Sequence, residues 1–170
     1  MKLIRRIALT ALVTFTTFGA VTFTSCNPDE CKDVICNNGG SCNSTDGSCT
    51  CATGYEGAAC ETEMRKKFMD TWTASDKEVG GSDLPTYNSS IVAGSGVTEV
   101  KISNFSDYFV NDVIATVSGS SITIASQDPD NDLYRVEGTG TFNAVDGKIT
   151  WTYTITNPAN LTKSYTGTWQ

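Results

Sequence analysis

The chain of 170 residues contains no histidine. Histidine is the commonest general base and metal ligand, and it completes the Ser–His and Cys–His pairs that activate nucleophiles. The sequence also has no Gly-x-Ser-x-Gly motif and no glycine-rich phosphate loop. These absences make an enzyme the weakest functional class, although the many carboxylates would permit a glycosidase by residue type. We therefore expect a protein that is not an enzyme.

Positive charge is scarce. The chain has 12 Lys and Arg residues against 19 Asp and Glu residues, and its formal net charge is −7. Three of the basic residues lie within positions 1–6, which contain no acid. Elsewhere, basic and aromatic residues do not cluster as binding to a phosphate backbone requires, so we expect no nucleic-acid partner.

Cysteine is missing from residues 61–170, because all seven cysteines lie between Cys26 and Cys60. Positions 7–23, after the basic start, are apolar enough for the core of a signal peptide, but threonines make them a poor membrane span. We therefore expect export. An odd number of cysteines in an exported chain needs an explanation, and Cys26, at the end of the apolar segment, stands apart from the other six.

The residues Phe23-Thr24-Ser25-Cys26 resemble the lipobox of bacterial lipoproteins, with Phe23 in place of the usual leucine. The resemblance implies that residues 1–25 are a signal peptide and that Cys26 carries acyl chains such as palmitate, which give stable membrane anchoring. The acidic tether at 26–30 resembles surface-export signals of Bacteroidetes-type lipoproteins. Together they imply a lipid anchor in the bacterial outer membrane, with display on the cell surface as a hypothesis. The alternatives are an ordinary signal peptide, with Cys26 free or paired, and an uncleaved anchor helix.

The six remaining cysteines follow the spacing C-x4-C-x5-C-x6-C-x-C-x8-C from Cys31 to Cys60. In an exported chain this density favours disulfides over a zinc site. Six cysteines allow fifteen pairings. Asp46-Gly47 is typical of the two-residue turn of a β-hairpin, which would pair the strand around Cys42 with the strand 49–51.

The run Cys49-Thr50-Cys51, followed by Gly57 and Cys60, resembles the C-terminal signature of EGF-like modules, and Gly54-Tyr55 matches the glycine–aromatic step of that family. The resemblance covers residues 31–60. It implies the disulfides Cys31–Cys42, Cys36–Cys49 and Cys51–Cys60. So short a segment cannot bury enough apolar surface to fold without such bonds.

Asn27, Asp29 and Glu30 match the N-terminal ligand half of calcium-binding EGF-like modules, whose oxygen ligands suit that ion. The second half is missing, because Ser44 and Gly47 stand where that family has Asn or Asp and an aromatic residue. We favour a solvated acidic tether and keep calcium binding by Asn27, Asp29 and Glu30 as the alternative. No other cofactor is expected.

Residues 61–67 are dense in charge and free of glycine and proline, with acids before bases, an order that suits the helix dipole. We predict one or two helical turns here, which would join the EGF-like module to the next domain more stiffly than a Gly/Ser linker.

Residues 68–170 are rich in threonine, serine, valine, isoleucine and aromatic residues, punctuated by glycine, asparagine and aspartate, as strands and turns are. Lys148–Thr156 is the clearest strand, because Ile149, Trp151, Tyr153 and Ile155 alternate with polar residues. We predict a mainly β fold in which about eight strands form an antiparallel meander that closes as a small barrel or packs as a sandwich. Asp128–Asp132 has the alternating acids of a calcium loop but lacks its glycine and glutamate, so we expect a solvated hairpin loop.

The domain resembles the one that follows a single EGF-like module in Bacteroidetes lipoproteins. The predicted short helix before Asp70-Thr71-Trp72 also resembles the start of the lipocalin pattern, with Asp70 in place of the glycine of that family. An eight-stranded barrel is either filled by side chains or holds one small ligand. We expect a filled core built on Trp72, Trp151, Tyr153, Phe142 and Trp169; the alternative is that Trp72, Trp151 and Tyr153 line a ligand pocket.

These expectations combine into a functional hypothesis. The chain is a non-catalytic envelope lipoprotein that acts in adhesion or structure, with the EGF-like module as a spacer and a protein or glycan as its partner. The alternative is a carrier that binds a small apolar ligand inside a lipocalin-like barrel.

Overall fold

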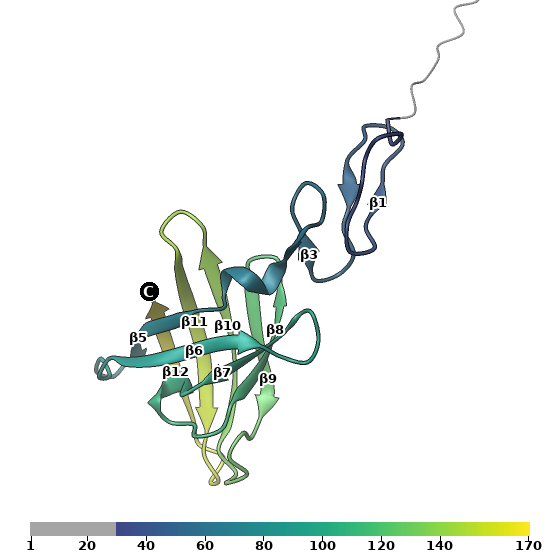
Figure 1. The fold of residues 1–170 in the computed structure, drawn as a ribbon. Helices are drawn as coiled ribbons and strands as arrows, with labels where there is room; N and C mark the ends of the chain where they lie inside the picture. The colour runs from purple at the N-terminus through teal and green to yellow at the C-terminus, as the bar shows by residue number, and fades with distance from the viewer. Residues whose placement is uncertain (1–29) are drawn as a thin grey trace, which may run out of the picture.

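The computed structural model describes residues 30–170, which form a disulfide-rich module, a short junction and a β-barrel along the chain (Figure 1). The predicted signal peptide, Cys26, Asn27 and Asp29 lie outside the described residues. No helix within 30–170 is both long and apolar enough to cross a membrane.

The N-terminal module consists of two small hairpins held by disulfides. Strand β1 (Ser41–Cys42) pairs with β2 (Cys49–Thr50), and β3 (Tyr55–Glu56) pairs with β4 (Thr62–Glu63). Three disulfides join the six cysteines, in the same pairs that the resemblance to EGF-like modules implies: Cys31–Cys42, Cys36–Cys49 and Cys51–Cys60.

The first hairpin has a longer turn than Asp46-Gly47 predicts. Cys42 lies opposite Cys49, so residues 43–48 form the connection. Of the two predicted turn residues only Gly47 has a positive φ, of 71°, whereas the two-residue turn needs both. The Asp46 carboxylate instead accepts hydrogen bonds from the amide and hydroxyl of Ser48, which fixes a wider loop.

The junction is only partly helical. Thr62 and Glu63 form strand β4, and the helix is the single 3-10 turn η1 (Met64–Lys67). The amide of Met64 donates to the carbonyl oxygen of Gly54, at 2.8 Å, in the connection that precedes β3. This bond continues the hairpin pairing one residue past β4, and the helix begins only there.

Eight antiparallel strands form a closed barrel, which confirms the predicted meander and selects the barrel over the sandwich. Each strand pairs with the next in sequence, and the last pairs with the first, so no sheet edge is left open. The strands are β5 (Thr71–Glu78), β6 (Tyr87–Ala93), β7 (Glu99–Ser103), β8 (Val113–Ser118), β9 (Ser121–Gln127), β10 (Arg135–Asn143), β11 (Lys148–Thr156) and β12 (Thr162–Trp169).

Side chains alternate between the interior and the outer surface of the barrel, as the two-residue period of strands requires. In β11 the four predicted apolar residues are buried. Outward positions carry threonine across adjacent strands, and Thr123, Thr139, Thr152 and Thr166 lie in register on β9 to β12. Threonine favours strands because its branched side chain packs well on the pleated surface.

The middle of the barrel interior is filled with aromatic and branched side chains. Phe105 is fully buried and packs against Trp151, Tyr153 and Trp169, with ring centroids 4.9 to 5.5 Å apart. It belongs to η2 (Phe105–Asp107), in the connection between β7 and β8, which folds into the barrel. Asn104, Ser106 and Asp107 all have φ between 50° and 63°, a left-handed conformation that is costly for non-glycine residues.

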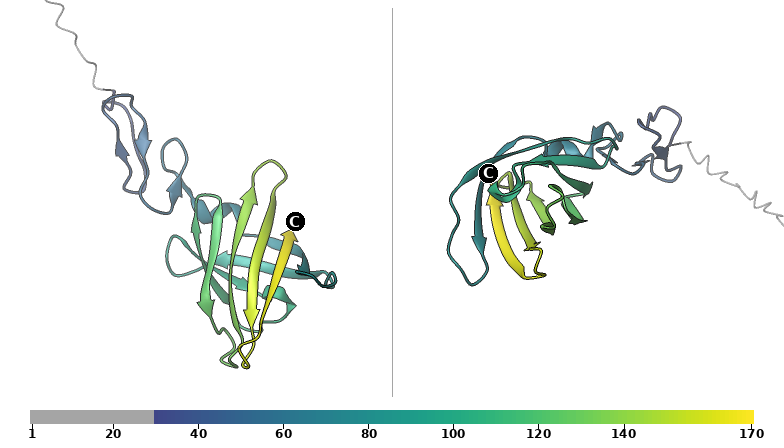
Figure 2. Two further views of the ribbon diagram at one scale, coloured as in Figure 1. Left: turned by 180° about the vertical axis from the view of Figure 1, so that it is seen from behind. Right: turned by 90° about the horizontal axis from the view of Figure 1, so that it is seen from below.

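The two ends of the barrel differ. At one end η1 covers the interior, and the turn between β6 and β7 meets the disulfide module; we call this end the base. The connections 79–86, 104–112, 128–134 and 157–161 gather at the other end, which we call the mouth. In Figure 1 the hairpins β9–β10 and β11–β12 point down, away from β1 and β3 at the upper right, and Figure 2 shows the module beyond the base in two further views.

Candidate ligand-binding site at the barrel mouth

The mouth contains a pocket of about 320 Å³. It lies in the part of the barrel interior next to the mouth, because strand alternation turns Tyr165 of β12 and Ile155 of β11 inward there. The lining residues are Tyr108, Tyr134, Ile155, Asn157, Leu161, Lys163 and Tyr165. Three tyrosines and two aliphatic side chains make the pocket mainly apolar, with polar groups at few positions, as small-molecule sites usually are.

The tyrosines are arranged in two pairs. The ring of Tyr108 lies 5.2 Å from that of Tyr134, tilted by 49°. The ring of Tyr165 stacks on that of Tyr153, with centroids 5.1 Å apart and planes 14° apart. Since Tyr153 covers one face of Tyr165, the pocket meets the edge or the opposite face of that ring.

The charged group in the lining is neutralised. Lys163 Nζ lies 3.0 Å from Oε2 of Glu78, on the neighbouring strand β5. The hydrogen bond and the charge of Glu78 raise the pKa of Lys163, so Lys163 stays protonated at neutral pH. Both side chains reach solvent, so the pair adds little to stability, but it leaves no net charge in the pocket wall.

Beneath the pocket lies a buried carboxylate, Asp76, which is 2% exposed. It accepts hydrogen bonds from the hydroxyls of Tyr87 at 2.5 Å and Tyr153 at 2.6 Å, and from the indole Nε1 of Trp169 at 3.2 Å. A Cβ at position 167 would overlap Oδ1 of Asp76, so Gly167 provides the space for the carboxylate. All three donors are uncharged, so hydrogen bonds alone offset the desolvation of this carboxylate.

The same network holds the inward-folded connection between β7 and β8. The amide of Ser106 donates to the hydroxyl of Tyr87 at 2.9 Å, and the hydroxyls of Ser106 and Tyr153 lie 2.9 Å apart. Burial and the nearby charge of Asp76 raise the pKa of Tyr87 and Tyr153 well above the usual range. Both tyrosines therefore remain neutral donors, and they fix the backbone two residues before Tyr108.

Carboxylates of the β9–β10 connection bind backbone amides. Asp130 accepts from the amides of Val110 and Asn111, at 3.0 and 2.8 Å, and so links two of the mouth connections. These hydrogen bonds lower the pKa of Asp130. Asp128 accepts from the amides of residues 132 and 133. The hairpin loop that we predicted is present, and its acids stabilise it by accepting hydrogen bonds from backbone amides.

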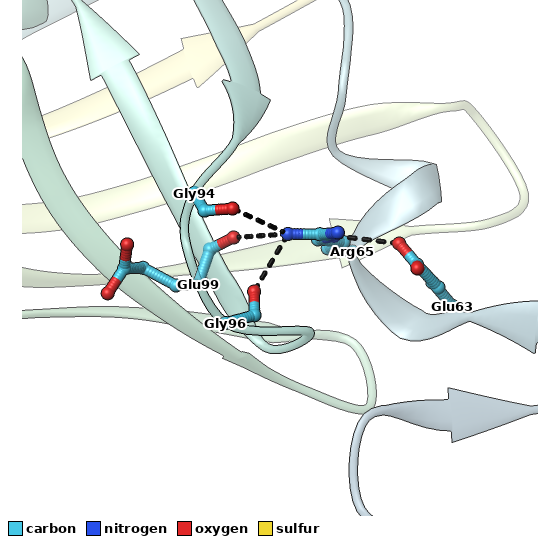
Figure 3. Close-up of polar contacts among 5 residues, drawn as sticks. All are labelled: Glu63, Arg65, Gly94, Gly96 and Glu99. Carbon is cyan, nitrogen blue, oxygen red and sulfur yellow. Dashed lines mark hydrogen bonds and ion pairs between the residues drawn. The ribbon is translucent and has the colours of Figure 1, made fainter. Parts of the chain in front are cut away.

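At the base, Arg65 of η1 fastens the junction to the barrel (Figure 3). Its Nη1 donates to the carbonyl oxygens of Gly94, Gly96 and Glu99, at 3.2, 2.8 and 3.1 Å, and its Nε donates to Glu63 at 2.8 Å. The guanidinium suits this role because its fixed, planar donors reach several acceptors at once. A charge-assisted bond of 2.7 Å between Lys67 and Glu56 ties η1 to the module as well.

The predicted pocket residues lie below the mouth pocket. Trp72 is buried near the base, where its Nε1 donates to the carbonyl of Phe68, and Trp151 is buried against Trp169. Tyr153 lies one layer under the pocket, in the Asp76 network. None of these three residues lines the mouth pocket. The wider core prediction fits their burial, and Phe142 packs against the core from a partly buried position.

Of the calcium candidates only Glu30 is described, and it is exposed. Within residues 30–170, no group of three or more acidic residues and cysteines is placed to hold a metal ion.

Sequence reasoning missed the residues that build the mouth. The two-residue period would have found some of them: Asp76 shares the inward face of β5 with Trp72, and Tyr165 shares that of β12 with Trp169. Tyr108 carried no such signal, because it lies in an irregular connection whose inward path depends on left-handed residues.

Comparison of the chain with protein-family models and with curated protein sequences gives no match.

Proposed function

We propose that the chain is a non-catalytic, lipid-anchored protein of the bacterial outer membrane that contacts a protein or glycan through the mouth of its barrel. In this proposal Cys26 carries the lipid, residues 1–25 are the signal peptide, and the EGF-like module at 31–60 is a spacer. The proposal rests on one observation, that the disulfide module and the mouth lie at opposite ends of the barrel.

The disulfide module joins the barrel at the base. Gly54 of the module lies against Val97, in the turn between β6 and β7, and the amide of Gly119, in the turn between β8 and β9, donates to Sδ of Met64. An anchor at Cys26 would therefore hold the membrane on the module side, and the mouth would face outward (Figure 1). A binding site for a partner outside the cell needs this orientation.

The junction is well suited to a spacer. Arg65 makes four charge-assisted hydrogen bonds, three of them to barrel carbonyls, and its side chain is 12% exposed. A junction of this kind resists bending more than a flexible linker does, so it restricts the position of the mouth relative to the module.

A carrier of a small ligand is the second candidate, and the pocket of about 320 Å³ inside a closed barrel favours it. The aromatic layer under the pocket counts against a long apolar ligand, because Phe105, Trp151 and Trp169 occupy the space into which an acyl chain would extend.

The proposal is tested in bacteria that express the full chain. A clickable palmitate analogue should label the wild-type protein and leave Cys26→Ser unlabelled, and an antibody against the barrel should stain intact cells. Cells carrying the wild-type protein should adhere to polysaccharide-coated or protein-coated surfaces more than cells carrying Leu161→Ala do. Failure of palmitate labelling, or adhesion that is indifferent to the mouth, would reject the proposal.

A further inference from the structure

The mouth pocket combines flat apolar surfaces with polar groups that have no partner among residues 30–170. Tyr108 is 44% exposed and Leu161 is 66% exposed, so both present apolar surface to a ligand. Within the described chain, no hydrogen bond involves the hydroxyl of Tyr165 or the Nδ2 of Asn157. A ligand that matched this wall would have an apolar face and hydrogen-bonding groups at its edge.

The charge of the wall indicates an uncharged ligand. Lys163 is paired with Glu78, so neither group is left to neutralise an ionised ligand. The acids of the β9–β10 connection, Asp128, Asp130 and Asp132, lie at the rim and disfavour an anion. An isolated cation would find no unpaired carboxylate in the lining itself.

The size and floor of the pocket indicate a short ligand. A volume of about 320 Å³ is at the lower end of the range of about 300–1,000 Å³ for small-molecule sites. The Asp76 network and Phe105 close the pocket from below, since both are buried and joined by Ser106. The pocket therefore has room for only one or two six-membered rings of a ligand.

We propose that the mouth pocket binds one or two pyranose rings at the end of a glycan, an inference that rests on the proposed function of the mouth as the contact face. A pyranose ring is uncharged, has an apolar face of C–H groups that stacks on a tyrosine ring, and carries hydroxyls around its edge. Stacking on Tyr108 or Tyr165 would orient the ring, and the Tyr165 hydroxyl and the Asn157 amide would bind its hydroxyls.

The buried network beneath makes Asp76 a positioning residue for this site. Asp76 binds the hydroxyl of Tyr153, whose ring supports Tyr165 from below, and the hydroxyl of Tyr87, which holds the amide of Ser106 two residues before Tyr108. Both walls of the pocket are therefore fixed before a ligand arrives, which lowers the entropy cost of binding.

The test uses the full chain, purified from membranes in detergent and applied to an array of neutral and acidic glycans. We expect retention of neutral glycans, followed by titration of the best of them. Tyr165→Ala should weaken binding by about tenfold or more, as loss of an aromatic anchor does. Leu161→Ala should weaken it severalfold without disturbing the fold, because this side chain is largely exposed. Thr152→Ala, on the outer surface of β11, should leave binding unchanged.

Absence of glycan retention, or retention that Tyr165→Ala and Leu161→Ala do not affect, would overturn the saccharide assignment. Preferential binding of acidic glycans or of fatty acids would overturn it as well. If adhesion of intact cells still depended on Leu161 in that case, the proposed function of the mouth would hold, and its partner would not be a saccharide. Loss of mouth-dependent adhesion together with glycan binding would reject both.

Discussion

Replacement of Asp76 by alanine tests whether the hydrogen bonds of this buried carboxylate stabilise the half of the barrel next to the mouth. The substitution removes the acceptor of three donors, the hydroxyls of Tyr87 and Tyr153 and the indole of Trp169. The Tyr153 hydroxyl can still donate to Ser106, 2.9 Å away, so two buried donors lose their acceptor.

Each buried donor left without an acceptor costs about 1–3 kcal/mol. Two of them cost about 2–6 kcal/mol, part of which is offset because a desolvated carboxylate is removed as well. We therefore expect Asp76→Ala to lower the free energy of unfolding by about 2–4 kcal/mol, a large part of the roughly 5–15 kcal/mol of a typical domain.

Urea unfolding followed by tryptophan fluorescence measures this loss, because Trp72, Trp151 and Trp169 all lie in the barrel. Asp83→Ala is the matched control. Asp83 is 82% exposed and pairs loosely with Lys77, at 3.4 Å, so its loss should cost about 0–1 kcal/mol. If Asp76→Ala were no more destabilising than this control, the network would not support the mouth as argued.

Three further predictions concern the junction, the tyrosines and the disulfides. Arg65→Ala should expose the junction to limited proteolysis and lower barrel stability by about 1–3 kcal/mol, whereas Lys66→Ala, at the exposed neighbouring position, should do neither. The pKa values of Tyr87 and Tyr153 are raised in the folded state, so both stay protonated above pH ~10, where the tyrosines of the unfolded chain ionise. The free energy of unfolding from urea titrations should therefore be steady below that pH and fall above it, by about 1.4 kcal/mol per pH unit for each of the two tyrosines. A free energy of unfolding that held to pH 11 would contradict this. Reduction of the disulfides should make residues 31–60 sensitive to protease and leave the tryptophan fluorescence of the barrel unchanged, since all three bonds lie within the module, and a fluorescence change on reduction would show that the barrel depends on them.

The regular parts of the fold were predictable because one physical rule governs each of them. Alternation of apolar and polar residues placed the strand Lys148–Thr156 and its buried face correctly. The filled core was expected because residues 68–170 are a short domain for a barrel that holds a ligand. The choice between barrel and sandwich was not predictable, because it depends on the pairing of β12 with β5 across the whole domain.

The mouth was harder to predict because its parts come from four separate connections. Tyr108 reaches the pocket only because η2 turns inward through three left-handed residues, and no local pattern specifies that path. The Asp46-Gly47 turn was mispredicted for a related reason. Its register is set by the Cys42–Cys49 pairing and the Asp46 cap, which override the preference of the dipeptide.

The central claim, that the barrel mouth is the binding face, is tested most directly by ¹⁹F NMR of the full chain labelled with fluorotyrosine. The chain has 6 tyrosines. Tyr108, Tyr134 and Tyr165 line the mouth pocket, and Tyr55 lies in the disulfide module beyond the base. Single Tyr→Phe variants assign the resonances. On titration with a neutral glycan, the three mouth resonances should shift and that of Tyr55 should stay in place. A shift of Tyr55 with unchanged mouth resonances, or no shift of any tyrosine, would contradict the claim.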